Sequence, residues 1–383
     1  MKTLWIWLAL VVVGIGAALF FGRSRVETGT GNRPWPLGLG LVADAPKRFP
    51  VTKDNAAATK LVELAAKANV DLHASRERRG GVSEDLREAL GEYARTQLER
   101  SGDSIDAPPS DVARYLTGNA ETLDEIRALA LSGTPIVFEA NPAHDFMGER
   151  RSGPNLFALQ YLQRTFVVRA LDAARGGNAA AWDELRAAWE LTRPLFGRPD
   201  PEGVLAGMTA ARMVNAAARK MPLPPPAWLR EVFTFDYERA YVAAQQVQAW
   251  RNKQPALNER LRGMSEEVLR AKACDAKSPQ FDAVREKLGG RATPSLVSGW
   301  ERLMRFRAER EATERVLQIR AGQAPSRDSQ CSDGSWDVTA KSFRFTRDVE
   351  SEYPAYDYPL EYGQSAPAQS PSSPPAAPAS GRR

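Results

Sequence analysis

The groups best suited to chemistry in this chain gather in one short loop, residues 138–151. The loop places a histidine among three carboxylates: Glu139, His144, Asp145 and Glu149. A histidine beside a carboxylate can act as a general base, and further carboxylates nearby can help to hold a metal ion. The loop therefore raises the hypothesis of a hydrolase. The alternative is an ordinary polar connection between two helices, which the turn signal Asn141-Pro142 favours.

The familiar catalytic and cofactor motifs are absent from the sequence. Only His73 and His144 are available, which excludes HExxH and every other multi-histidine metal motif. There is no G-x-S-x-G nucleophile elbow and no phosphate-binding loop. Residues 38–43 match a dinucleotide fingerprint by letter, but the prolines around them leave no strand or helix to frame it. We expect no cofactor and no metal.

Cys274 and Cys331 are the two cysteines of the chain. Neither belongs to a C-x-x-C pair, and two thiols with two histidines make no convincing zinc site. In an oxidising compartment such a pair would form a disulfide, closing a loop of about 50 to 60 residues and contributing on the order of 4 kcal/mol. Two unrelated buried thiols are the alternative.

An apolar segment without a charged residue runs from Leu4 to Phe21. At about 1.5 Å per residue a helix of this length spans roughly 27 Å, close to the hydrocarbon thickness of a bilayer. A cleaved secretory signal has a similar layout, but this run is long and ends in Leu19-Phe20-Phe21, without a small-x-small cleavage site. Residues 1–22 therefore predict a retained transmembrane anchor.

The orientation of that anchor rests on few charges. Lys2 precedes the apolar run, whereas Arg23 and Arg25 follow it, so the positive-inside count is nearly balanced. A short leader with an immediate lysine is the usual bacterial arrangement with the N-terminus inside. We expect a single-pass protein of the bacterial inner membrane whose body lies in the periplasm or outside the cell.

Two further segments have the composition of unstructured chain. Residues 23–52 are rich in glycine and proline and predict a flexible linker. Residues 364–383 are almost entirely Pro, Ala, Ser and Gly, have nothing to bury, and predict a disordered tail. The net charge is only +5 and no polybasic arm occurs, so we expect no nucleic-acid partner.

Residues 53–325 predict a helical domain, because apolar residues recur every three or four positions among Ala, Leu, Glu and Arg. Asn55, Ser83 and Asn119 are expected caps. The expected helices cover residues 56–68, 84–98, 119–132, 154–175, 178–194, 202–220, 237–251, 257–273 and 296–321. The fold class is mainly α, as a multi-helix bundle or as solenoid-like helical hairpins.

A possible internal repeat bears on that choice. Residues 119–135 and 178–194 share Asn, Ala, Asp-Glu, Arg-Ala and a closing proline. The alternative is that any capped helix rich in Ala, Glu and Arg reads this way. The hairpin over residues 156–194 is similar in layout to a tetratricopeptide hairpin, although Trp182 and Trp189 stand where that family needs small residues.

Residues 326–363 break the helical pattern. Trp336, Val338, Phe343 and Phe345 alternate with polar residues and predict a small β-hairpin. An extended run of tyrosine and proline follows, and we expect both parts to pack on the helical domain.

The favoured function is that of a membrane-anchored, extracytoplasmic interaction or structural module of the bacterial envelope. It would have an envelope protein as partner and no catalysis of its own. One alternative is an envelope hydrolase that uses the carboxylates near His144. The other is a module that binds cell wall or anionic lipid through the Tyr/Pro run or the arginines of residues 296–321, for which pairing with glutamates of the same helix is the competing interpretation.

Overall fold

The computed structural model describes residues 49–73, 82–140, 153–198, 201–251, 274, 294–347 and 357–363. Within them the chain forms ten helices and one three-stranded antiparallel sheet, so the prediction of a mainly helical fold is confirmed. The predicted anchor over residues 1–22, the helix expected over 257–273 and the tail over 364–383 lie outside the described residues. In the described part of the chain, no helix has the length and apolar character needed to span a bilayer.

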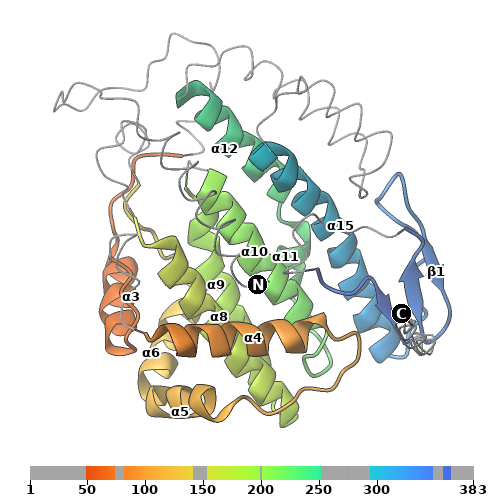
Figure 1. Cartoon of the computed structure of the whole chain (residues 1–383), viewed down its shortest axis with the longest axis horizontal. Helices are drawn as coiled ribbons and strands as arrows, with labels where there is room; N and C mark the ends of the chain where they lie inside the picture. The colour runs from red at the N-terminus through yellow and green to blue at the C-terminus, as the bar shows by residue number, and fades with distance from the viewer. Residues whose placement is uncertain are drawn as a thin grey trace, which may run out of the picture.

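Three long helices stand side by side at the centre of the molecule (Figure 1): α8 (Leu156–Arg175), α9 (Ala181–Phe196) and α10 (Pro201–Ala218). Asn155 caps α8, since its side-chain oxygen accepts hydrogen bonds from the backbone nitrogens of Phe157 and Ala158. Gly177 follows the end of α8 with a positive φ of 68°, a conformation that glycine adopts at little cost. The chain then reverses into α9, which forms the second helix of the hairpin expected over residues 156–194.

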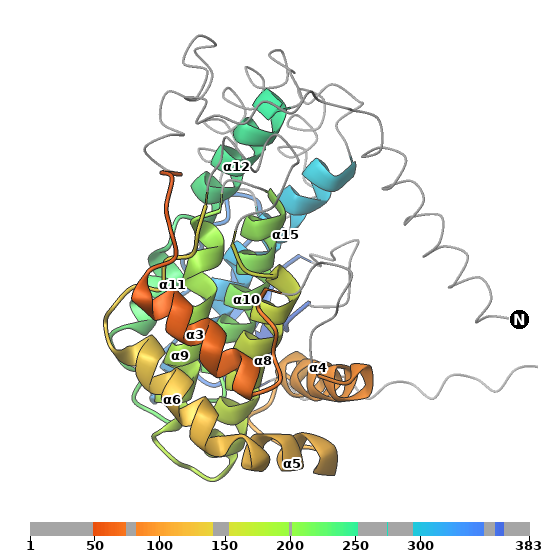
Figure 2. The same ribbon diagram turned by 90° about the vertical axis from the view of Figure 1, so that its left-hand side faces the viewer.

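Four helices from the first part of the chain surround this bundle: α3 (Ala56–Lys67), α4 (Glu84–Glu99), α5 (Ser110–Gly118) and α6 (Ala120–Leu131). Figure 2 shows α3 and α6 on one side of the bundle, with α6 against α9. Asn55 and Ser83 cap α3 and α4 through their side chains, as expected. The sequence analysis did not foresee α5, a short helix that begins directly after Pro109.

The repeat proposed from sequence relates α6 to α9, and these two helices pack against each other. One pair of equivalent positions nevertheless differs in environment. Glu184 of α9 is buried and accepts hydrogen bonds from Arg127 and from Arg169, the latter at 2.9 Å. The matching residue of α6, Glu125, is exposed. The two segments therefore have the same residue at this position but different contacts.

The last helices are α11 (Leu229–Thr234), α12 (Tyr237–Arg251) and α15 (Pro294–Arg320). The sequence analysis predicted α12 and α15 but missed α11, which is only six residues long. In Figure 1, α15 runs diagonally beside α10, and it packs against both α10 and α12. Phe196 and Tyr237 meet with ring centroids 5.5 Å apart, and Phe306 of α15 lies 4.8 Å from Tyr237. This aromatic contact joins the central bundle to the last helix.

The strands β1 (Trp336–Val338), β2 (Phe343–Phe345) and β3 (Glu361–Tyr362) pair antiparallel in the order β1-β2-β3. The expected two-stranded hairpin is thus part of a larger sheet, because the end of the Tyr/Pro run returns as a third strand with Phe343 opposite Tyr362. The apolar face of the sheet packs with Ala308, Ala312 and Val316 of α15 in a core of its own. Figure 1 shows the sheet beside this helix.

Candidate functional site

Only one carboxylate of the loop that was predicted to do chemistry falls within the described residues. Glu139 is exposed and lies in a short extended pairing, in which the backbone nitrogen of Thr52 donates to the Ala140 carbonyl oxygen at 2.8 Å. The backbone nitrogen of Glu139 itself donates to the Asp54 carboxylate at 2.5 Å. His144, Asp145 and Glu149 lie outside the described residues, so the proposed convergence of these groups stays a prediction.

Cys274 and Cys331, the candidate pair from the sequence, are joined by a disulfide with their Cα atoms 5.3 Å apart. Both are buried beside the small sheet. The backbone nitrogen of Cys274 donates to the Asp333 side chain at 2.8 Å. Close by, Glu311 of α15 accepts hydrogen bonds from the Trp336 indole nitrogen at 2.5 Å and from the Gln330 backbone nitrogen at 2.7 Å. The chain around Cys331 is therefore attached to the fold in two ways, by the disulfide and by the hydrogen bonds to Glu311 of α15.

A second cluster, which we call the Glu309 clamp, consists of Glu309, Arg212, Arg219 and Arg305. Glu309 is fully buried, and its two carboxylate oxygens accept hydrogen bonds from Arg212 at 2.8 and 2.6 Å. Arg305, one turn earlier on α15, lies 3.3 Å from the same carboxylate. Burial alone would raise the pKa of Glu309, but the guanidinium groups of Arg212, Arg305 and Arg219 outweigh it and hold the pKa below its ordinary value.

The Glu309 clamp also holds the end of the described chain. Arg305 donates to the Tyr358 carbonyl oxygen at 2.6 Å, and Arg219 donates to the Pro359 carbonyl oxygen at 2.5 Å. The backbone nitrogen of Tyr358 donates back to Glu309 at 3.3 Å. The tyrosine itself is buried. These bonds hold the chain directly before β3 against α10 and α15.

The sequence analysis considered that the arginines of α15 pair with glutamates of the same helix, but several of them bind other parts of the chain. Such pairs exist, for instance between Arg315 and Glu311 at 3.6 Å. However, Arg307 and Arg310 both reach Glu238 of α12, each at 3.2 Å. Together with the Glu309 clamp, these contacts make the arginines of α15 links between helices. The spacing of charges along one helix cannot reveal a partner on another.

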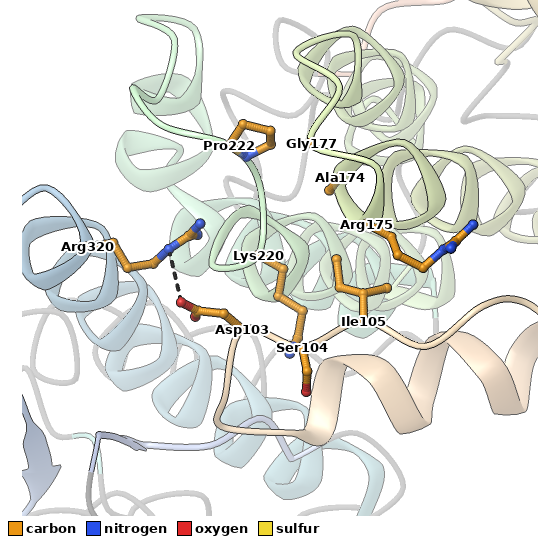
Figure 3. A pocket seen from close by; sticks show the side chains of 9 residues that line it. All are labelled: Asp103, Ser104, Ile105, Ala174, Arg175, Gly177, Lys220, Pro222 and Arg320. Carbon is orange, nitrogen blue, oxygen red and sulfur yellow. Dashed lines mark ion pairs between the residues drawn. The ribbon is translucent and has the colours of Figure 1, made fainter.

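A cavity of about 360 Å³ opens where the C-terminal ends of α8, α10 and α15 meet the chain that follows α4 (Figure 3). Its charged lining comes from all four elements: Asp103, Arg175, Lys220 and Arg320. The remaining lining residues are Ser104, Ile105, Ala174, Gly177 and Pro222. We call this the Lys220 cavity, because of the unusual position of that ammonium group.

Lys220 is only 5% exposed. Its ammonium donates a hydrogen bond to the Gly102 carbonyl oxygen, and no carboxylate in the described part of the chain forms an ion pair with it. Burial lowers the pKa of Lys220 to about 8. The carboxylate of Asp103 opposes this shift, whereas Arg100, Arg219 and Arg320 add to it.

The other two cations of the Lys220 cavity have carboxylate partners. Arg320 forms an ion pair with Asp103 at 3.5 Å, marked by the dashed line in Figure 3, and also donates to the Arg219 carbonyl oxygen. Arg175 donates to Asp172, one turn earlier on α8, at 3.1 and 2.8 Å. Asp103 in turn accepts a hydrogen bond from the Tyr362 hydroxyl at 3.0 Å, which connects the cavity to β3. Among the described residues, Lys220 is therefore the cation of this lining without an ion pair.

Sequence reasoning did not find this cavity. Asp103, Lys220 and Arg320 belong to no motif and come from segments far apart in the chain. A lysine at the end of the apolar helix α10 was the only local sign. No group of three or more metal-ligating side chains occurs within the residues that the structure describes. No family model, no curated protein and no solved structure matches the chain.

Proposed function

We propose that this protein is a membrane-anchored, extracytoplasmic interaction or structural module of the bacterial envelope that acts by contact. The anchor is the apolar run from Leu4 to Phe21, and the partner is an envelope protein. The helical body would be a rigid support that fixes the position of the C-terminal chain relative to the membrane.

The Glu309 clamp is the observation that carries this proposal. The body buries several charged side chains at the junction of α10, α15 and the segment before β3, and these charges bind one another and the backbone of Tyr358 and Pro359. Buried charges of this kind stabilise one arrangement when every partner is satisfied, and breaking one pair is costly. The charges thus hold together elements that lie far apart in the sequence.

The disulfide supports the proposed location. Disulfides persist in oxidising environments such as the bacterial periplasm and are rare in the cytosol. The Cys274–Cys331 bond joins chain segments 57 residues apart and is buried on both sides. A topology test follows from this: a reporter enzyme that is active only outside the cytoplasm, fused after Gly363, should be active. An inactive fusion at normal expression would contradict the proposed orientation.

The two alternatives find less support. For the hydrolase, Glu139 is exposed and does not line the Lys220 cavity, and its proposed neighbours lie outside the described residues. For a binding module based on the Tyr/Pro run, Tyr358 is buried and Tyr362 lies in β3 with its hydroxyl bound to Asp103. Neither ring is presented as a free binding platform.

The contact function can be tested by photo-crosslinking of the full-length chain in intact cells. Val51 and Phe157 are the large apolar side chains that stand most exposed among the described residues, at 61% and 63%. A photoreactive amino acid at either position should give a discrete adduct with an envelope protein. The matched control is the same amino acid at exposed Lys341, between β1 and β2. Adducts that are absent from both positions, or that occur equally at all three, would contradict the proposal.

A further inference from the structure

The Lys220 cavity holds one positive charge that the described residues do not balance. Arg320 faces Asp103 at 3.5 Å, and Arg175 is bound to Asp172 at 2.8 Å. Each of these two ion pairs has no net charge, so the positive charge of Lys220 is the one that remains in the lining. A buried ammonium without a counter-charge is unfavourable, and an anion of one charge in the cavity would remove that cost.

Lys220 also has hydrogen-bonding capacity to offer. A protonated lysine has three N–H donors. One donates to the Gly102 carbonyl oxygen, and within the described part of the chain no other protein atom accepts a hydrogen bond from the ammonium. The Ser104 hydroxyl lines the same cavity (Figure 3). Charge and free donors therefore occur together, as the oxygens of an anion require.

The favourable interaction of a cation with the C-terminal end of a helix explains the positions of Arg175 and Arg320 but not that of Lys220. Arg175 and Arg320 are the last residues of α8 and α15, where a cation interacts favourably with the helix dipole. Lys220 lies beyond the last residue of α10, Ala218, and its ammonium turns to Gly102 in the segment after α4. It thus reaches across the cavity to another part of the chain.

The rest of the lining restricts the ligand to a small molecule with an apolar part. Ile105, Ala174 and Pro222 provide apolar surface beside Lys220, and the volume is about 360 Å³, at the small end of ligand pockets. We propose that this cavity binds a small organic monocarboxylate, whose carboxylate pairs with Lys220 and whose short apolar body contacts Ile105, Ala174 and Pro222. This site goes beyond the proposed contact function and does not depend on it.

Isothermal titration of the detergent-solubilised full-length chain with acetate, butyrate and hexanoate tests the proposal, with inorganic phosphate as a further arm. Binding should strengthen from acetate to butyrate by up to roughly fourfold per added CH₂ group. Lys220→Met removes the charge but keeps an unbranched side chain only one atom shorter, and should weaken butyrate binding roughly tenfold or more. Lys220→Arg, which keeps the charge, should retain part of the binding.

Two further variants separate binding at this site from general effects. Lys60→Met is the matched control, because Lys60 is exposed on α3 and pairs only with Glu63 of the same helix in the described chain. It should bind like the wild type. Ala174→Leu fills the cavity without changing any charge and should abolish binding. The proposal is overturned if no carboxylate binds, if phosphate alone binds, or if Lys220→Met binds butyrate as tightly as Lys60→Met does.

Discussion

The Glu309 clamp and the Lys220 cavity both bury cations from the same helix or its immediate end, yet they treat the charge in opposite ways. Arg212 is 3% exposed and Lys220 is 5% exposed. Burial lowers the pKa of either group, but the negative charge of Glu309 and the two hydrogen bonds that it accepts from Arg212 reverse this and raise the pKa of Arg212 above its ordinary value. Lys220 has no such carboxylate partner in the part of the chain that the structure describes, and its pKa falls to about 8.

The difference teaches that burial alone does not decide what a charged residue is for. A planar guanidinium can engage both oxygens of one carboxylate, so Arg212 and Glu309 satisfy each other within the fold. The Lys220 ammonium is compact, has a single backbone acceptor in the described chain and faces a cavity. The first arrangement contributes to holding the chain together, and the second leaves a charge available to a ligand.

The largest effect should come from breaking the Glu309 clamp. Glu309→Gln removes the carboxylate charge and leaves Arg212, Arg219 and Arg305 without it in the core, which should cost about 3–5 kcal/mol of stability. The midpoint of denaturant unfolding of the full-length chain measures this. Glu63→Gln breaks an exposed pair with Lys60 and should cost less than about 1 kcal/mol. Equal effects of the two substitutions would contradict the role given to the clamp.

The disulfide should contribute somewhat less. Cys274 and Cys331 are 57 residues apart in sequence, and closing a loop of that length stabilises the folded chain by about 2–4 kcal/mol, mainly by restricting the unfolded chain. The double variant Cys274→Ser/Cys331→Ser should unfold at lower denaturant concentration, and reduction of the wild type should give the same midpoint. An unfolding midpoint that does not change on reduction would show that the bond contributes nothing to stability.

Local signals made much of the helical fold predictable. Asn55 and Ser83 cap helices through their own side chains, as expected, an interaction that needs only residues two or three positions away. The third expected cap, Asn119, makes no side-chain hydrogen bond to the start of α6, so the prediction was wrong in this respect. The missed helices, α5 and α11, have nine and six residues, too few for a clear apolar periodicity.

The candidate site could not be predicted in this way. Glu309 binds Arg212, which is 97 positions away in the sequence. Strand β3, which pairs with β2, has only two residues. The Lys220 cavity combines Asp103 and Arg320 with the end of α10. Such contacts depend on how the helices pack, and no spacing rule within one element encodes them. The chemistry expected in residues 138–151 came from composition alone, whereas the charges found at the centre of the fold were scattered in the sequence.

Removing the unbalanced charge should increase stability. The folded pKa of Lys220, about 8, lies below its ordinary value of 10.5. Between these pH values the unfolded chain binds a proton that the folded chain does not, so this group makes stability rise with pH, by at most about 1.4 kcal/mol per unit. In ligand-free protein, Lys220→Met should therefore be more stable than the wild type at pH 7 by about 1–3 kcal/mol.

The difference in stability between Lys220→Met and the wild type should shrink as the pH rises from 8 and disappear above about 10.5, where Lys220 is neutral in both the folded and the unfolded chain. Denaturant unfolding at pH 7, 8, 9 and 10 measures the difference and cancels the titration of other groups common to both chains. The charged or titratable groups around the cavity are Arg100, Asp103, Asp106, Arg175, Arg219, Arg320 and Tyr362, and none of them is altered by the substitution. A Lys220→Met chain less stable than the wild type at pH 7 would mean that the ammonium is balanced within the protein.

The smallest effect concerns the link between the two regions. The Tyr362 hydroxyl of β3 donates to Asp103 at 3.0 Å, so the chain held by the Glu309 clamp also reaches the rim of the Lys220 cavity. The Asp103 side chain is 47% exposed, and water can replace the lost hydrogen bond. Tyr362→Phe should therefore cost less than about 1 kcal/mol. If the two regions act independently, Tyr362→Phe should leave the pH dependence of the Lys220→Met difference unchanged, whereas a shift in that dependence would show that β3 positions Asp103 against Lys220.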